Sequence, residues 1–535
     1  MNQRPGPHKP RPRLVTKTQG NCMGSTPAIK SPGYAALLGG ALFLCFFPFL
    51  PEQGAATLSL SLFLTALLAA LFLYPLLRGW VDGQVDLFHP ISFAVLAYLF
   101  PNYVIKSLYL LFHGWPEGQS SCPLYLPQYQ LMALLLVLLA YLALALGYWL
   151  RLGERLGQML PAPPHFPLDP GESRGLLLAL FLGGYLLIYV LAATWSGFYE
   201  REHETTWRQL SCIGYYCFFL MAFLYFRHPA AAPRLKLPLL FMAVITAAFL
   251  LTSGSRYALL MHIMYFLGAW QFARGRGLSR STLLKALAVP IILLPLVLVI
   301  STNYRLVAYK NYGSRSHETA SKRIDNFSEA IVKTLNSNVS ENVDFAYEIL
   351  INRLPGLDTL IVVLSAGPQA KALERAFGID NNIPDDLFWM LVPRLFYPEK
   401  PIMMERGKYF GYIYWGQPLS IYSFPALTPI ADLYRFGGVL ALFVGMLVMG
   451  IFLKVVRTWL IGKEGQVGAY AALFYIYLIT PLRGAFESSY TSLFFVTSRC
   501  LVVLYSFVLL IYLCYLLLNR PSVSSKKAIY RQPPA

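Results

Sequence analysis

Long apolar runs recur along most of this 535-residue chain. Several continue for about 18 residues or more, which is long enough for a helix to cross a hydrocarbon core of roughly 30 Å. Only 13% of the residues are charged and 56% are hydrophobic, whereas about a quarter of a soluble protein is charged. Because lipid offers no hydrogen bonds, such runs must fold as helices that satisfy their own backbone groups. The sequence therefore predicts an all-α polytopic membrane protein.

The apolar runs predict about twelve transmembrane helices, nine before a long polar interval and three after it. We expect a basic tail over 1–33, helices over 34–302, a polar loop over 303–432, helices over 433–518 and a second tail over 519–535. The expected spans lie near residues 34–50, 56–78, 90–113, 126–150, 174–194, 209–226, 235–252, 256–273, 283–302, 433–456, 466–482 and 491–518.

Lysine and arginine gather in alternate loops, which orients the chain. The short loops near Glu52 and Glu117 carry neither, and the loop Trp195–Arg208 mixes both signs. Basic loops stay in the cytoplasm. We therefore expect both termini in the cytoplasm and the 303–432 loop outside, and this topology also accounts for the net charge of +18 without a nucleic-acid partner. The basic loops carry Arg151, Arg155, Arg174, Arg227, Arg234, Lys236, Arg274, Arg276, Arg280, Lys285, Lys454, Arg457 and Lys463.

Motifs of nucleotide-driven and metal-dependent enzymes are missing from the sequence. It contains no P-loop, no GxGxxG after a strand pattern and no HExxH. The seven cysteines are scattered, without the spacing of a zinc site or a disulfide framework. We therefore predict neither a metal ion nor another cofactor.

The polar interval is too long for a simple connection. It contains an expected helix over Asn326–Arg353 and a short apolar stretch over Leu357–Ser365 that cannot span a membrane. The run Ile383–Tyr397 mixes apolar, acidic and aromatic residues, which is typical of a helix at the membrane interface. Its aromatic rings suit either sugar stacking or an interfacial belt.

Some arginines stand at the expected outer ends of spans, against the bias for external loops. A guanidinium binds phosphate oxygens through paired hydrogen bonds and keeps its charge at neutral pH. Ser253, Gly254 and Ser255 allow a tight turn whose backbone N–H groups lie beside Arg256. These arginines predict a site for a lipid diphosphate, with interfacial anchoring as the alternative for each. They are Arg256, Arg305, Arg435 and Arg483.

Carboxylates accompany these arginines. One of them could accept a proton from a sugar hydroxyl as a general base, and the alternative for each is an ion pair with a neighbouring arginine. His203 and His317 are further candidates for a base. The acidic candidates are Asp385, Asp386, Glu399, Asp432 and Glu487.

Three short motifs resemble the Wzy-type polymerases of oligosaccharide repeat units, which make O-antigen and exopolysaccharide. They are the turn Ser253–Arg256, the stretch Pro393–Pro401 with Arg394 and Lys400, and the stretch Thr428–Gly438. The resemblance covers roughly the second half of the chain. It implies a GT-C-like membrane glycosyltransferase with a large periplasmic loop.

The resemblance also implies residue roles. The family's phosphate-binding arginine corresponds to Arg256, and a second functional arginine corresponds to Arg394, Arg435 or Arg483. We expect Arg256, Arg483, Arg435 and Asp432 to be catalytic. We expect Ser253, Ser255, Arg305, Arg394, Lys400 and Glu487 to bind the substrate.

The activity implied by the resemblance is polymerisation of undecaprenyl-diphosphate-linked oligosaccharides at the outer face of the bacterial inner membrane. A chain-length regulator and a flippase would be partners. An O-antigen ligase, which transfers the glycan to lipid A core, is the closest alternative. A polysaccharide transporter is a further one, which the scarcity of charges within the spans disfavours.

Overall fold

The computed structural model describes most of the apolar runs and much of the polar interval. Within some helices it describes the backbone alone. The described residues are 55–113, 127–161, 181, 185, 201–228, 232–253, 256–275, 277–284, 299–304, 306–308, 310–311, 320–336, 347, 350–352, 354–392, 397, 406–420, 427–462, 467–479 and 489–518.

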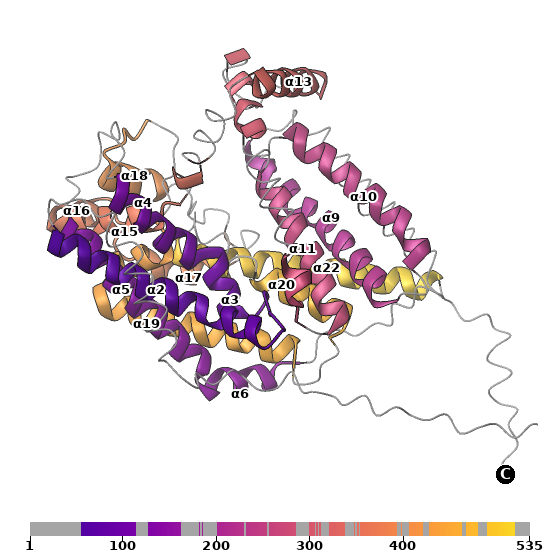
Figure 1. Ribbon diagram of the computed structural model, residues 1–535, viewed down its shortest axis with the longest axis horizontal. Helices are drawn as coiled ribbons and strands as arrows, with labels where there is room; N and C mark the ends of the chain where they lie inside the picture. The colour runs from indigo at the N-terminus through magenta and orange to yellow at the C-terminus, as the bar shows by residue number, and fades with distance from the viewer. Residues whose placement is uncertain are drawn as a thin grey trace, which may run out of the picture.

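The described residues are almost entirely helical, and the β-structure among them is one isolated bridge between Val85 and Leu278. Figure 1 shows two groups of helices, one that contains α2, α5 and α19 and one that contains α9, α10 and α11, and the short helices α15, α16 and α18 lie together at one end of the first group. The helices are α2 (Ala55–Val81), α3 (Pro90–Ala94), η2 (Val95–Ile105), α4 (Lys106–His113), α5 (Pro127–Trp149), α6 (Arg151–Met159), α9 (Arg201–Arg227), α10 (Ala232–Ser253), α11 (Arg256–Arg274), α13 (Ala320–Asn336), α15 (Gly356–Ser365), α16 (Gly367–Ala376), α17 (Asn382–Leu391), α18 (Arg406–Trp415), α19 (Pro429–Leu460), α20 (Ala469–Ile479) and α22 (Tyr490–Leu518).

Four described helical segments are long and apolar enough to cross a membrane. The second of them joins α3, η2 and α4, and η2 is a π-helix that contains Pro101. Proline has no N–H to donate, so the backbone widens around it. The four segments are Ala56–Val81, Pro90–His113, Gln128–Trp149 and Pro429–Leu460.

The remaining expected spans are described to different extents. α9, α10, α11, α20 and α22 each coincide with one of them. The expected span at 34–50 and both tails lie outside the described residues, as do most of 174–194 and of 283–302. The membrane character of the chain is therefore supported by four segments, and the full set of twelve stays a prediction.

Glycines bring α5 and α19 unusually close together. A Cβ on Gly147 would overlap the backbone of Leu447, and a Cβ on Gly450 would overlap the backbone of Leu144. The two helices run side by side in the same direction. Because a helix pair with small residues can approach backbone to backbone, this seam gives extensive van der Waals contact.

Polar contacts tie several helix ends together at one end of the bundle, which we call the Asp86 end. Arg457 near the end of α19 pairs with Asp86 at 3.6 Å, and Gln271 of α11 donates to the same carboxylate. Arg280 donates to the carbonyls of Trp80 and Val81 at the end of α2. Arg227 at the end of α9 donates to the carbonyl of Ala273. The basic ends of α2, α9, α11 and α19 therefore meet here.

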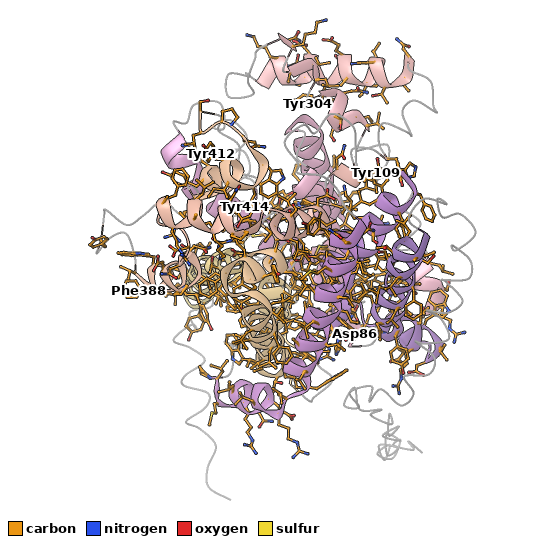
Figure 2. The ribbon with its side chains drawn as sticks, turned by 90° about the vertical axis from the view of Figure 1, so that its left-hand side faces the viewer. Asp86, Tyr109, Tyr304, Phe388, Tyr412 and Tyr414 are labelled. Carbon is orange, nitrogen blue, oxygen red and sulfur yellow. The ribbon has the colours of Figure 1, made fainter. Side chains whose placement is uncertain are left out.

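The opposite end, the Asp432 end, holds the described helices of the polar interval. α11 begins at Arg256 and α19 begins at Pro429, a helix length away from the Asp86 end. In Figure 1, α15, α16 and α18 gather at the end of α5 and α19 that lies away from α6. Figure 2 shows Asp86 towards the bottom of the bundle and Tyr412 and Tyr414 towards the top.

One predicted helix of the polar interval has different bounds in the structure. The sequence predicts a helix over Asn326–Arg353, and its start is wrong, since α13 already begins at Ala320. As the structure describes it, α13 ends at Asn336. The apolar stretch Leu357–Ser365 does form a helix, α15, as its length allows. This helix is buried against α5, α19 and η2, where Gly356 donates its N–H to Asn102 at 2.9 Å.

Candidate functional site

The first two turns of α19 form a separate segment that positions two charged side chains. Pro429 occupies the first helical turn, where its missing N–H costs nothing. Gly437 and Gly438 then break the helix, and Gly438 has φ 64° and ψ −150°, a conformation that is essentially restricted to glycine. The segment Pro429–Phe436 can therefore lie at an angle to the apolar remainder of α19.

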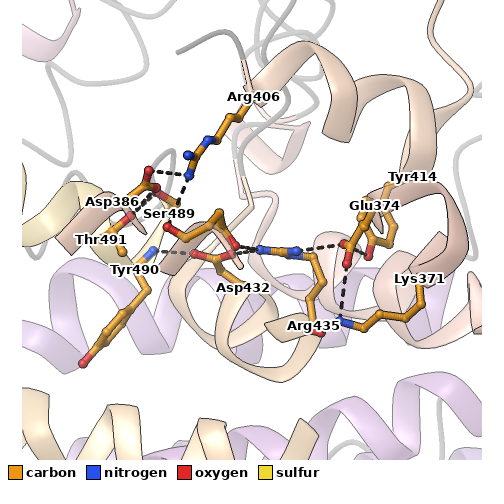
Figure 3. Close-up of polar contacts among 11 residues, drawn as sticks. Lys371, Glu374, Asp386, Arg406, Tyr414, Asp432, Arg435, Ser489, Tyr490 and Thr491 are labelled. Carbon is orange, nitrogen blue, oxygen red and sulfur yellow. Dashed lines mark hydrogen bonds and ion pairs between the residues drawn. The ribbon is translucent and has the colours of Figure 1, made fainter. Parts of the chain in front are cut away.

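Arg435 is completely enclosed at the centre of this region (Figure 3). Its guanidinium pairs with Glu374 of α16 at 2.9 Å and with Asp432, three residues earlier in α19, at 2.9 Å. It also donates to the side chain of Asn382 and lies 4.6 Å from the ring centre of Phe410. The side chains of Arg435, Glu374 and Asp432 are all 0% exposed. Four separate helices thus enclose one guanidinium.

Glu374 makes two further contacts with residues of the short helices. The hydroxyl of Tyr414 donates to it at 2.6 Å, and Lys371 pairs with it at 3.3 Å from the preceding turn of α16. Lys371 also donates to the carbonyl of Arg435. Burial and the charge of Glu374 raise the pKa of Tyr414 far above its ordinary value, so its hydroxyl remains a donor.

A second ion pair extends the arrangement towards α22. Asp432 accepts a hydrogen bond from the backbone N–H of Tyr490 at 3.0 Å. Asp386 of α17 pairs with Arg406 of α18 and accepts from the hydroxyl of Thr491 at 3.1 Å. We call this group the Asp432 cluster; it comprises Lys371, Glu374, Asn382, Asp386, Arg406, Tyr414, Asp432, Arg435, Tyr490 and Thr491 (Figure 3).

Asp386 differs from the other carboxylates of the cluster. Its side chain is 7% exposed and that of Arg406 is 15% exposed, so this pair lies nearer to solvent than Arg435 does. Burial raises the pKa of Asp386 to about 6, although Arg406 and Thr491 act in the opposite direction. Asp386 is therefore the described carboxylate of the cluster whose protonation can change near neutral pH.

The structure brings some of the sequence-predicted residues together. Asp432 and Arg435 pair with each other, and Asp385 lies 3.9 Å from Arg406 beside Asp386. For these residues the arrangement is the ion pairing that the sequence left open as an alternative. Ser253 ends α10 and Arg256 begins α11, so the backbone of both lies at one helix junction at the Asp432 end.

Other predicted residues fall outside the described part of the chain. Arg483 and Glu487 precede Ser489, whose hydroxyl lies 3.2 Å from that of Thr491. Their segment therefore leads directly into the Asp432 cluster. The residues outside the described ranges are Ser255, Arg305, His317, Arg394, Glu399, Lys400, Arg483 and Glu487.

Sequence reasoning missed several members of the cluster. Glu374 and Lys371 are spaced like an ordinary surface pair on a helix, and nothing in the sequence marks Glu374 as buried. It also missed the buried pair of Lys106 with Asp358 at 2.8 Å, which ties α4 to α15. A lysine within an expected span was the available signal, since such a residue needs a partner.

Metal ligands do not gather in the described ranges. Within them, no group of three or more His, Cys, Asp or Glu side chains lies close enough to hold a metal ion. The charged groups of the Asp432 cluster pair with one another, and the Nε of Arg435 is left without a hydrogen-bond partner among the described residues.

The fold and the cluster define a helical membrane protein in which the short helices of a polar interval are locked onto one end of apolar spans. The chain belongs to the family described as a domain of unknown function, DUF8712, whose model matches residues 185–523. No curated protein and no solved structure matches the chain. The matched range contains all the predicted site residues and leaves out α2 to α6.

Proposed function

We propose that this protein is a Wzy-type polymerase, a GT-C-like glycosyltransferase that joins undecaprenyl-diphosphate-linked oligosaccharides. The observation that supports it best is a shared location. The Ser253–Arg256 junction, the Asp432 cluster and helices α15–α18 all lie at the end of the bundle opposite the Asp86 end. Two of the three motifs that carry the sequence resemblance, Ser253–Arg256 and Thr428–Gly438, belong to these regions, and the third, Pro393–Pro401, comes between α17 and α18 in the chain.

The proposal includes an orientation in the inner membrane. Basic residues gather at the Asp86 end, where Arg78, Arg227, Arg274, Arg280 and Arg457 lie at helix ends. Under the positive-inside rule this end faces the cytoplasm. The Asp432 end then faces the periplasm, where lipid-linked repeat units are available, and the full protein has about twelve spans with both termini inside.

Arg256 would bind the diphosphate of the donor. It is the first residue of the 19-residue helix α11, so the N–H groups that have no partner within the helix and the positive end of the helix dipole lie beside it. A guanidinium at that place adds charge and two-point geometry for phosphate oxygens. Arg483 would contribute from the segment that leads into Ser489.

The Asp432 cluster would position the acceptor side. Arg435 and Asp432 already satisfy each other within the cluster, so they serve best as the frame that fixes α16, α17 and α18. Asp386, which lies closer to solvent, is our candidate for the general base.

The proposed reaction transfers the donor glycan to a hydroxyl group of the acceptor glycan. The acceptor hydroxyl oxygen forms a bond with the donor's anomeric carbon while that carbon's bond to the diphosphate oxygen breaks. The hydroxyl proton moves to a carboxylate, and undecaprenyl diphosphate leaves with its charge stabilised by arginine. The joined glycan remains attached to the acceptor's lipid.

The test is glycan gel analysis of a deletion strain complemented with variants. We expect Arg256→Ala to lose polymer almost completely, by at least about 100-fold in rate if one charge-stabilising group is removed. Arg256→Lys should also be impaired, because an ammonium lacks the fork of donors. Arg375→Ala, which changes an exposed arginine of α16 at the same end, is the control and should leave polymer unchanged.

Two outcomes would contradict the proposal. Full-length polymer from the Arg256→Ala variant, at a normal protein level, would remove Arg256 from the site. A deletion strain whose lipid A core carries no repeat unit at all would favour a ligase, because loss of a polymerase leaves single units attached.

A further inference from the structure

α6 presents an apolar stripe that nothing in the described structure covers. Leu152, Leu156 and Met159 follow one another at helical spacing and are 50%, 42% and 80% exposed. Viewed along the helix axis, these three positions fall within a narrow sector of the helix surface. Such a stripe on a nine-residue helix is otherwise unfavourable in water.

The glycines of α6 determine which side of this helix contacts α19. Gly153 and Gly157 are buried, and a Cβ on either would overlap Lys454 or Thr458 of α19. These close approaches fix α6 against the last turns of α19, near Arg457 and the Asp86 end. The apolar stripe therefore has to face away from the bundle.

Two arginines border this stripe. Arg151 and Arg155 are exposed, and their helical positions place them on the side of the stripe that lies away from the glycines. Glu154 is the one acidic residue of α6, and it follows Arg151 by three positions, so it lies next to Arg151 on the side away from the stripe. The surface thus combines apolar and positively charged groups.

Exposed apolar side chains also occupy the end of the preceding span, directly before α6 in the chain. Leu142, Leu146 and Trp149 of α5 are 51%, 46% and 49% exposed, as expected for side chains that face lipid. The helix breaks at Leu150, whose backbone is extended, and α6 then starts. The chain thus passes from the hydrocarbon region directly into a short basic amphipathic helix.

We infer that α6 is an interfacial helix that binds anionic phospholipid, with Leu152, Leu156 and Met159 among the acyl chains and Arg151 and Arg155 on the lipid phosphates. Its place directly after the lipid-facing end of α5 favours a membrane over a protein partner. Docking of α6 against a second copy would bring Arg151 and Arg155 of both copies together, with Glu154 as the one acidic residue of each helix, so like charges would outnumber opposite ones. This inference does not depend on the proposed enzymatic activity.

The test measures thermal unfolding of the full-length protein in a neutral detergent, with added phosphatidylglycerol or phosphatidylcholine. We expect phosphatidylglycerol to raise Tm more than phosphatidylcholine does, and high salt to reduce that difference. The double variant Arg151→Gln, Arg155→Gln should lose the difference and keep the response to phosphatidylcholine. Arg375→Gln at the other end of the bundle is the matched control and should behave like the wild type.

Three results would overturn the inference. The first is an equal response of the wild type to both lipids, and the second is a double variant that retains the full difference. The third is a detergent-solubilised dimer that dissociates when Leu152 and Leu156 are changed to Gln, which would assign the stripe to a second copy.

Discussion

The two ends of α19 each carry an arginine paired with an aspartate, yet the two pairs differ in their surroundings. At the Asp432 end, Arg435 and both of its carboxylate partners are 0% exposed. At the Asp86 end, Arg457 is 26% exposed and Asp86 is 39% exposed. The second pair is partly exposed to solvent and the first is not, so the first pair depends entirely on its protein partners.

This difference assigns different tasks to the two ends. An exposed ion pair contributes up to about 1 kcal/mol and can be lost with little consequence. A buried one is costly unless every partner is in place, so it specifies a unique arrangement of the helices that supply those partners. The Asp86 end joins helix termini, whereas the Asp432 end fixes the geometry of α16, α17 and α18.

The largest test of this comparison removes each arginine. Arg435→Met should destabilise the protein by about 3–5 kcal/mol, because Glu374 and Asp432 would remain as uncompensated buried charges. Arg457→Met should cost less, because its pair with Asp86 is partly open to solvent. Unfolding of the purified variants in a denaturant series measures both, and equal losses would refute the distinction between the two ends.

A backbone comparison tests the kink of α19. Gly438→Ala should cost about 1–3 kcal/mol, because alanine must adopt a conformation that is nearly restricted to glycine. Gly462→Ala, at the other end of the same helix with φ 62°, should cost about 1 kcal/mol. The same unfolding assay ranks the two, and a neutral Gly438→Ala would show that the kink is not required for the fold.

The smallest expected effect concerns pH. Because the folded-state pKa of Asp386, about 6, lies above its ordinary value, the folded protein takes up this proton first. Its contribution to stability therefore increases as pH falls from 7 to 5.5, by about 1 kcal/mol, and is lost as pH rises through about 6. Asp386→Asn should remove this part of the pH dependence, while Asp385→Asn, which is half exposed, should retain it.

The measurement is the difference in unfolding free energy between pH 5.5 and 7 for the wild type and both variants. Parallel profiles for the wild type and Asp386→Asn would mean that Asp386 is already protonated or remains charged throughout. Either result would also remove it as our candidate for the general base.

Periodicity and composition predicted the helices well but not the partners of their charged residues. Continuous apolar runs fix where a helix must form, so α2, α5 and α19 lie close to their expected positions. Asp432 and Arg435 were singled out because they stood at the start of a span. Their partner Glu374 was not, because burial of that carboxylate depends on how α16 packs, which local sequence does not encode.

The insertion of α15 was equally hard to predict. Its length excluded a span, and the sequence offered no sign that Gly356 would approach Asn102 closely enough to leave no room for a Cβ. The close pairing of α5 with α19 is a similar case, since glycines in an apolar helix do not indicate which helix they will pack against.

The break at Gly437 and Gly438 has a mechanical consequence. The ladder of hydrogen bonds that stiffens α19 is interrupted there, so the turn that carries Asp432 and Arg435 is held by side-chain contacts to α16, α17 and α18 rather than by the helix alone. Leu433 packs on Gly445, and the hydroxyl of Tyr490 donates to the Gly445 carbonyl, so the apolar part of α19 supports the charged assembly directly.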